Sequence, residues 1–261
     1  MSGTVGLLLA GLLLLTPAVR AAEAKVVTKE VTFKSGDDEV KGYLAMPEGK
    51  GPFPGIIVIQ EWWGLTDWIK ENARHFAERG YVALAPDLYR GKATNDPSVA
   101  MKLARGLPAD RAVRDLKAAT DYLAKNEKVK KDRLGSIGWC MGGGYSLQLA
   151  LKDKRIVACA ICYGRVETDP DALKPLNATI LGVFGKEDKG IPITRVREFA
   201  KALKDAGKKV EAIHEYDAGH GFMRPGKNPA HNADEAKRAW EAIDKFFAKT
   251  LKDKGSSSAA P

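Results

Sequence analysis

Cys140 lies at the centre of a glycine-rich segment, SIGWCMGGGYSL, which has the composition of a strand before it and of a helix after it. A sharp turn from strand into helix strains the residue at its apex, and the glycines at positions 138, 142 and 143 remove side chains that would collide there. The apex also lies at a helix N-terminus, whose free N–H and dipole favour a thiolate. The segment therefore predicts that Cys140 is a nucleophile, with a structural cysteine in a tight turn as the alternative.

Four other polar residues follow the ends of predicted strands: Glu61, Asp87, Asp188 and His220. A nucleophile, an acid and a histidine in the chain order Cys140, Asp188, His220 match the order of a hydrolase triad. His220 would take or share the thiol proton, and Asp188 would orient the imidazole and stabilise its charged form. Alone, His220 could satisfy loop carbonyls and Asp188 could cap the next helix; together they favour a triad.

The remaining histidines and cysteines predict no further chemistry. His75, His214 and His231 have no metal-ligand partner at suitable spacing, so we expect neither a metal nor an organic cofactor. Cys159 and Cys162 form a C-x-x-C within a run of strand composition. Three residues of strand rise span about 10 Å, beyond the roughly 7 Å limit for a disulfide, so we interpret both as small buried hydrophobes with free thiols.

The elements that must position these residues alternate along the chain. An antiparallel hairpin (26–33 and 40–46) is followed by continuous apolar strands alternating with helices, which indicates an α/β fold whose mostly parallel sheet is covered on both faces. The ligand site of such a sheet lies beyond the carboxyl ends of its strands. The predicted strands are 55–60, 81–87, 133–139, 156–163, 179–185 and 210–216, and the predicted helices are 65–79, 108–126, 141–152, 195–206 and 233–251.

Length and composition indicate one large domain, which we place at residues 25–252. The chain has 261 residues, 44% of them hydrophobic, and its net charge of +9 comes from basic and acidic residues scattered along it. No dense basic block is present, so we expect no nucleic-acid partner. We expect a monomer that binds a small-molecule substrate.

The first 24 residues are predicted to be a signal peptide. Residues 5–15 are almost entirely Leu, Gly, Ala and Val, and the small-residue run AVRAAEA follows, with cleavage expected between positions 21 and 24. The alternative is an uncleaved anchor. We therefore expect a periplasmic or secreted protein whose mature form has no membrane span, with a disordered tail at residues 253–261.

Five short motifs resemble the dienelactone hydrolases, the carboxymethylenebutenolidase-like branch of the α/β-hydrolases. They are QEWWG, APDLY, GWCMGG, GKED and GHGF in that order, and the resemblance runs from about residue 28 to 250. It implies the α/β-hydrolase fold, a triad of Cys140, Asp188 and His220, and an oxyanion hole made by the backbone N–H groups of Trp62 and Met141. It also implies that Glu61 pairs with the thiol at rest until substrate displaces it.

Substrate recognition is less well matched by the resemblance. The family binds a substrate carboxylate with two arginines; one corresponds to Arg224, but the other position holds Gly91, with Arg90 one residue early. A guanidinium fork binds a carboxylate in a fixed geometry, so the shift matters. Aromatic residues are expected to line an apolar pocket, with a place in the core as the alternative: Trp62, Trp63, Tyr89 and Phe222.

The sequence thus predicts a hydrolase that cleaves a small ester or lactone through a cysteinyl acyl-enzyme. A thioesterase or general carboxylesterase with the same triad is the alternative enzyme. A non-catalytic exported binding protein with the hydrolase fold is the alternative outside enzymes.

Overall fold

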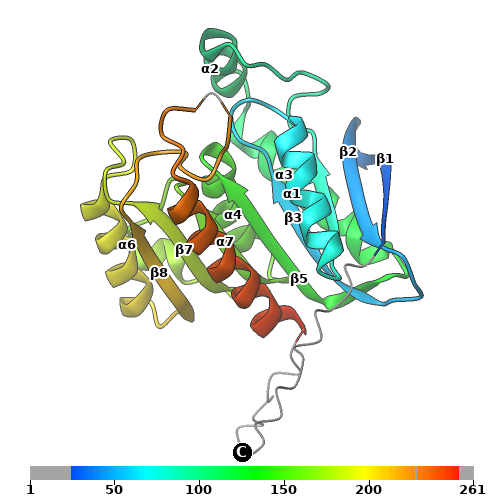
Figure 1. Cartoon of the computed structure of the whole chain (residues 1–261). Coiled ribbons are helices and arrows are strands. Elements are labelled where there is room, and N and C mark those ends of the chain that lie inside the picture. Colours follow the sequence, from blue (N-terminus) through cyan, green and yellow to red (C-terminus); the bar gives the residue numbers. More distant parts are fainter. Residues whose placement is uncertain (1–24, 227, 253–261) are drawn as a thin grey trace, which may run out of the picture.

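The computed structural model describes residues 25–226 and 228–252, which form an eight-stranded sheet with helices on both faces (Figure 1). The predicted signal peptide and the predicted disordered tail lie outside the described residues. The strands are arranged in the order β1-β2-β4-β3-β5-β6-β7-β8. They are β1 (Val26–Ser35), β2 (Asp38–Pro47), β3 (Phe53–Ile59), β4 (Val82–Pro86), β5 (Val129–Trp139), β6 (Ile156–Cys162), β7 (Thr179–Gly185) and β8 (Val210–Tyr216).

The sheet is parallel from β4 through β8 and antiparallel at its N-terminal edge. β1 and β2 form the predicted hairpin, with Ser35 opposite Asp38 next to the turn, and β2 runs antiparallel to β4. The other neighbouring strands run parallel. This is the α/β-hydrolase architecture that the sequence predicts, with the carboxyl ends of β3 to β8 along one edge.

Helices cover the sheet on both sides because its central strands are apolar on both faces. The helices are α1 (Asp67–Glu78), α2 (Pro97–Arg105), α3 (Ala109–Lys125), α4 (Met141–Lys152), α5 (Pro170–Leu173), α6 (Ile193–Asp205) and α7 (Ala233–Phe247), and a π-helical turn, Ala248–Lys252, continues α7. The apolar sides of α1 and α7 pack on one face and those of α3, α4 and α6 on the other. In β3, every residue from Ile56 to Ile59 is buried, which is why this strand reads as a continuous apolar run.

Two helices were not predicted from the sequence, α2 and α5. α2 buries only Ala100, so it lacks the apolar stripe that marks a core helix. Its start is nevertheless specified, because Asp96 accepts hydrogen bonds from the backbone N–H groups of Ser98 (2.7 Å) and Val99 (3.4 Å) and Pro97 occupies the first turn. α2 projects above the edge of the sheet that carries the strand ends (Figure 1).

The strand prediction for Cys159 and Cys162 is confirmed. Both lie in β6, both are fully buried, and all three cysteines of the chain are free. In the described part of the chain, no helix combines the length and apolar character needed to cross a membrane.

Candidate active site

Cys140 occupies the turn between β5 and α4, as its sequence context predicts. β5 ends at Trp139 and α4 begins at Met141, so Cys140 has both neighbours in regular structure and takes φ 54° and ψ −118°. A positive φ is unusual for a residue with a Cβ and stores strain. The turn is tight enough that a Cβ on Gly142 would collide with the backbone carbonyl oxygens of Ile59 and Gln60. The glycines therefore allow the bend, and the bend holds the thiol above the sheet.

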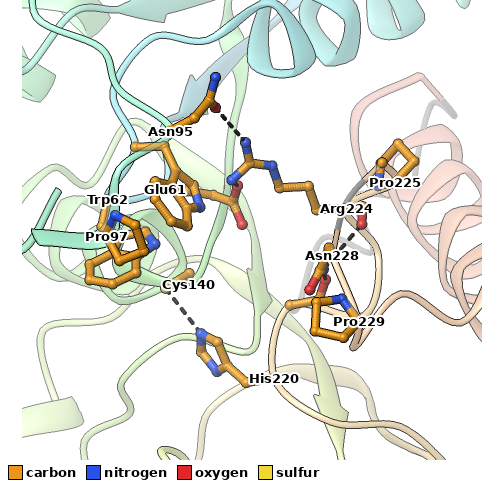
Figure 2. Close-up of a pocket in the computed structure, with 13 residues that line it drawn as sticks. Glu61, Trp62, Asn95, Pro97, Cys140, His220, Arg224, Pro225, Asn228 and Pro229 are labelled. Carbon is orange, nitrogen blue, oxygen red and sulfur yellow. Dashed lines mark hydrogen bonds and ion pairs between the residues drawn. The ribbon is translucent and has the colours of Figure 1, made fainter.

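The structure brings Cys140, His220 and Asp188 into one chain of contacts. The Nε2 atom of His220 lies 3.0 Å from Sγ of Cys140, and its Nδ1 atom lies 2.7 Å from Oδ2 of Asp188. The other carboxylate oxygen of Asp188 accepts the backbone N–H groups of Gly190 (2.8 Å) and Ile191 (2.9 Å). Figure 2 shows the imidazole directed at the thiol. The acid is thus fixed by backbone and can fix the imidazole in turn.

The electrostatics of this chain favour a charged histidine. Burial lowers the pKa of His220, but its hydrogen bonds with Asp188 and Cys140 and the charges of both partners outweigh burial and raise the pKa to about 10. Burial raises the pKa of Asp188, but the hydrogen bonds from His220 and from the N–H of Ile191 lower it overall. Asp188 therefore stays ionised and supports an imidazolium.

Glu61 follows β3 and is almost completely buried. Its nearest charged partner is Arg224, whose Nη1 lies 3.6 Å from Oε2 of Glu61. Burial raises the pKa of Glu61 to about 7, although the charges of Arg224 and His220 oppose the shift. The thiol contacts His220, whereas the carboxyl group of Glu61 faces Arg224 (Figure 2). This arrangement differs from the resting pair of Glu61 and the thiol that the family resemblance implies.

Two backbone N–H groups of interest lie near Cys140. Trp62 is in the turn directly after Glu61, and Met141 is the first residue of α4. Neither N–H donates a hydrogen bond to another residue in the described part of the chain. Both are therefore available to a ligand oxygen, which is what an oxyanion hole requires.

A cavity of about 1070 Å³ opens beside Cys140 and His220 (Figure 2). Arg224 forms part of its wall: the guanidinium lies over the ring of Trp63, 4.9 Å from the ring centroid, and Nη2 is 3.5 Å from Oδ1 of Asn95. Arg224 and Trp63 thus lie where the sequence predicts substrate contacts. The described lining residues are Glu61, Trp62, Trp63, Asn95, Pro97, Cys140, His220, Gly221, Arg224, Pro225, Gly226, Asn228 and Pro229.

Three residues predicted to bind substrate lie outside this lining. Arg90 points toward α3, where its Nη1 lies 2.8 Å from the buried carboxylate of Asp115. The hydroxyl of Tyr89 donates to Sδ of Met141 at 3.3 Å, and the ring of Tyr89 is buried in the core. Phe222 is fully buried. The structure thus gives Tyr89 and Phe222 the core placement that was the alternative, and it directs Arg90 away from the cavity.

Asp87, the remaining polar residue at a strand end, accepts hydrogen bonds within its own loop. Its carboxylate accepts the backbone N–H groups of Tyr89 (2.9 Å) and Gly91. No group of three or more His, Cys, Asp and Glu side chains that could hold a metal ion occurs within residues 25–226 and 228–252.

Several residues of the site were missed in the sequence. Asn95, Pro97, Pro225, Asn228 and Pro229 line the cavity from loops that have no hydrophobic periodicity, and their only signal is the density of Pro, Gly and Asn. Tyr163 follows β6 with φ 38°, and its ring centroid lies 5.3 Å from that of His220. Tyr163 is the last residue of the predicted strand 156–163, so its place at a strand end was the available signal.

Comparison with known proteins shows similarity over nearly the whole described chain. A sequence model described as "Dienelactone hydrolase family" matches residues 40–251. The protein named "Putative carboxymethylenebutenolidase" from Methylorubrum extorquens is 31% identical over 236 residues, covering 85% of this chain and 81% of the relative. The protein of the same name from Escherichia coli K12 is 30% identical over 244 residues, covering 88% and 89%.

Solved structures show the same similarity. The crystal structure titled "Putative Dienelactone Hydrolase" from Klebsiella pneumoniae has a TM-score of 0.78 and 27% identity, covering 86% of this chain and 99% of that one. A dienelactone hydrolase-like promiscuous phosphotriesterase from metagenomic libraries also has a TM-score of 0.78, at 24% identity and with 87% and 99% coverage, and this likeness concerns the fold alone.

Proposed function

The chain belongs to the dienelactone hydrolase family, and on this premise we propose that it hydrolyses a small ester or lactone through an acyl-enzyme on Cys140. One observation carries the proposal: the unbroken contact from Asp188 through His220 to a thiol at a strained turn beside a cavity. Neither a turn with a cysteine nor a histidine with a carboxylate would suffice alone. Their alignment at hydrogen-bond distance is what nucleophilic catalysis needs.

In the first half of the proposed reaction, His220 holds the thiol proton on Nε2 as an imidazolium, and the thiolate Sγ of Cys140 attacks the carbonyl carbon. The carbonyl π electrons move to oxygen, and the N–H groups of Trp62 and Met141 hold the resulting oxyanion. When the tetrahedral adduct collapses, the C–O bond to the alcohol breaks and His220 gives its proton to the leaving oxygen. The product of this half is a thioester on Cys140.

In the second half, water replaces the alcohol. His220 takes a proton from the water, whose oxygen attacks the thioester carbonyl, and the C–S bond then breaks. The acid leaves, and the proton taken from the water stays on His220 as the partner of the thiolate. Asp188 keeps the imidazole in the same orientation through both halves, and its negative charge stabilises the imidazolium in each.

Glu61 and Arg224 are proposed to set the charge beside the nucleophile. Each is the other's nearest opposite charge in the described site, at 3.6 Å, and both line the cavity that Cys140 enters. Without Arg224, an ionised Glu61 would repel the forming thiolate. The pair thus lets a buried carboxyl group lie near the thiol without opposing its ionisation.

The proposal is tested by trapping the acyl group. Purified protein without the first 24 residues is mixed with 4-nitrophenyl acetate, quenched in acid and mapped by mass spectrometry. We expect the acyl mass on Cys140, and we expect Cys140→Ala and Cys140→Ser to lose several orders of magnitude in kcat because triad members act as a unit. Cys159→Ala is the matched control, because it removes a buried thiol away from the cavity and should leave the rate near wild type. Wild-type rates in Cys140→Ala and Cys140→Ser would exclude the mechanism and favour the non-catalytic binding protein.

We also propose that the enzyme works outside the cytoplasm. The support is the apolar run at residues 5–15 followed by small residues. Intact-mass analysis of protein recovered from the periplasm or medium should give an N-terminus between residues 22 and 25. Recovery of full-length chain from the cytosol alone would exclude export.

A further inference from the structure

The cavity beside Cys140 has a wall that suits hydrocarbon. Trp62 and Trp63 line it with ring centroids 4.7 Å apart. Pro97, Pro225 and Pro229 add further apolar surface (Figure 2). Burial of apolar substrate surface against such a wall is favourable, whereas a carboxylate placed there would lose its hydration without gaining a partner.

The one lysine or arginine in the described lining is Arg224, and its guanidinium already has three neighbours. It lies 3.6 Å from Oε2 of Glu61, 3.5 Å from Oδ1 of Asn95 and over the face of Trp63. A substrate carboxylate would have to compete with the buried carboxyl group of Glu61 for this cation. An ionised Glu61 released from Arg224 would then be a buried charge without a partner, which is unfavourable.

Arg90 does not supply a second cation. Its guanidinium lies 2.8 Å from Asp115 and 3.5 Å from Asp38, and Asp115 is fully buried. Moving Arg90 toward the cavity would remove the nearest cation from buried Asp115 and leave it with the hydroxyl of Ser35 at 2.6 Å and the more distant Arg114 at 3.9 Å. The ion pair therefore holds Arg90 on the α3 side of the loop.

The charges near Cys140 leave no excess positive charge for a substrate. Glu61 and Arg224 cancel each other, the negative charge that forms on Cys140 is matched by the imidazolium of His220, and ionised Asp188 adds one further negative charge. A further negative charge on the substrate would meet a forming thiolate and no unpaired cation in the described site. Repulsion and desolvation both act against such a substrate.

We infer that the substrates of this enzyme are esters whose acyl part is apolar and carries no carboxylate, bound along the wall of Trp62, Trp63 and the three prolines. The inference rests on the proposed function and narrows it to one chemical class. It follows from the side chains that line the cavity and from the ion pair that holds Arg90.

The test compares two esters of equal length and equal leaving group, 4-nitrophenyl hexanoate and mono-4-nitrophenyl adipate. With the wild-type enzyme at pH 8, we expect kcat/KM to be at least tenfold higher for the hexanoate. Binding is measured separately by NMR titration of the Cys140→Ala variant, which holds ester without turning it over, and the hexanoate should again bind at least tenfold more tightly. Equal or tighter binding of the adipate ester would overturn the inference, whatever the rates are.

Two variants sharpen the comparison in the Cys140→Ala background. Glu61→Gln leaves Arg224 without its negative partner, so the adipate ester should gain at least fivefold in affinity relative to the hexanoate; no gain would contradict the charge balance argued above. Trp63→Leu should weaken the binding of 4-nitrophenyl hexanoate more than that of 4-nitrophenyl acetate. An equal loss of affinity for the two esters would contradict the apolar wall. Failure of the proposed function would look different: wild-type hydrolysis no faster than that of Cys140→Ala.

Discussion

The strain at Cys140 can be measured by removing the side chain in two ways. Cys140→Ala and Cys140→Gly both delete the thiol, but only glycine adopts φ 54° and ψ −118° without a Cβ penalty. A strained dihedral pair stores about 1–3 kcal/mol, glycine costs about 0.5–1 kcal/mol in unfolded-chain entropy, and loss of a half-buried Cβ costs about 0.4 kcal/mol. From the middle of these ranges, we expect Cys140→Gly to be about 1 kcal/mol more stable than Cys140→Ala.

The assay is urea unfolding and thermal unfolding of the two variants at one pH. For a domain of this size, about 1 kcal/mol corresponds to a difference of about 2–4 °C in Tm. Ala150→Gly, in the regular part of α4, is the matched control and should be destabilised by about 1 kcal/mol or more, because its backbone is helical and its side chain is buried. If Cys140→Gly proves no more stable than Cys140→Ala, the turn is not strained and the account of the nucleophile's position is wrong.

Three further outcomes are expected. Gly142→Ala should unfold or lose several degrees of Tm, because the added Cβ would collide with backbone atoms. Gly144→Ala should be tolerated, because the nearest atom to a Cβ at that position is 3.4 Å away. Equal effects of the two substitutions would contradict the tight turn. Arg90→Gln should cost about 2–3 kcal/mol in urea unfolding, because buried Asp115 would keep only the Ser35 hydroxyl and the more distant Arg114 as partners, while kcat/KM stays near wild type. A large loss of activity would place Arg90 at the substrate. The pKa of Glu61 is raised from 4.5 to about 7, so the stability that its protonated form contributes is complete below pH 4.5 and is lost as pH rises to 7. This decline in the free energy of unfolding, up to about 3 kcal/mol, should be absent in Glu61→Gln. Parallel pH profiles of urea unfolding for the wild type and the variant would contradict the shift.

The sequence specifies the central sheet well because its strands are buried on both faces. The predicted bounds of α4, β7 and β8 agree with the structure residue for residue, and each is bounded by a change of composition at a turn. The three residues of the proposed triad were predicted to lie together for the same reason. Strand ends in a parallel sheet share one edge, so chain order and a polar residue after each strand are enough to bring Cys140, Asp188 and His220 together.

The direction of a loop side chain is a different kind of information, and Arg90 shows why the sequence could not supply it. Its φ of 57° turns the chain at that residue, and its partner Asp115 lies on α3, 25 positions along the chain. No local pattern encodes a contact between a turn and a distant helix. The same holds for the cavity wall, where Pro97 and Pro229 come from loops without periodicity.

The proposed catalytic residues and the cavity wall are held by different parts of the chain. The loop that carries Asp188 is tied to the loop that carries His220 by backbone hydrogen bonds, from Lys186 N–H to Tyr216 O (2.8 Å) and from Glu187 N–H to Ala218 O (3.1 Å), and the N–H of Cys140 donates to the carbonyl of Cys162 at 3.0 Å. These bonds do not depend on side-chain identity. The wall, in contrast, consists of side chains such as Trp63 and Arg224 that contact each other. Substitutions in the wall can therefore change which ester is bound while the geometry of the proposed triad stays fixed. Because of this separation, the substrate class follows from Arg90, Arg224 and the tryptophans and not from the triad.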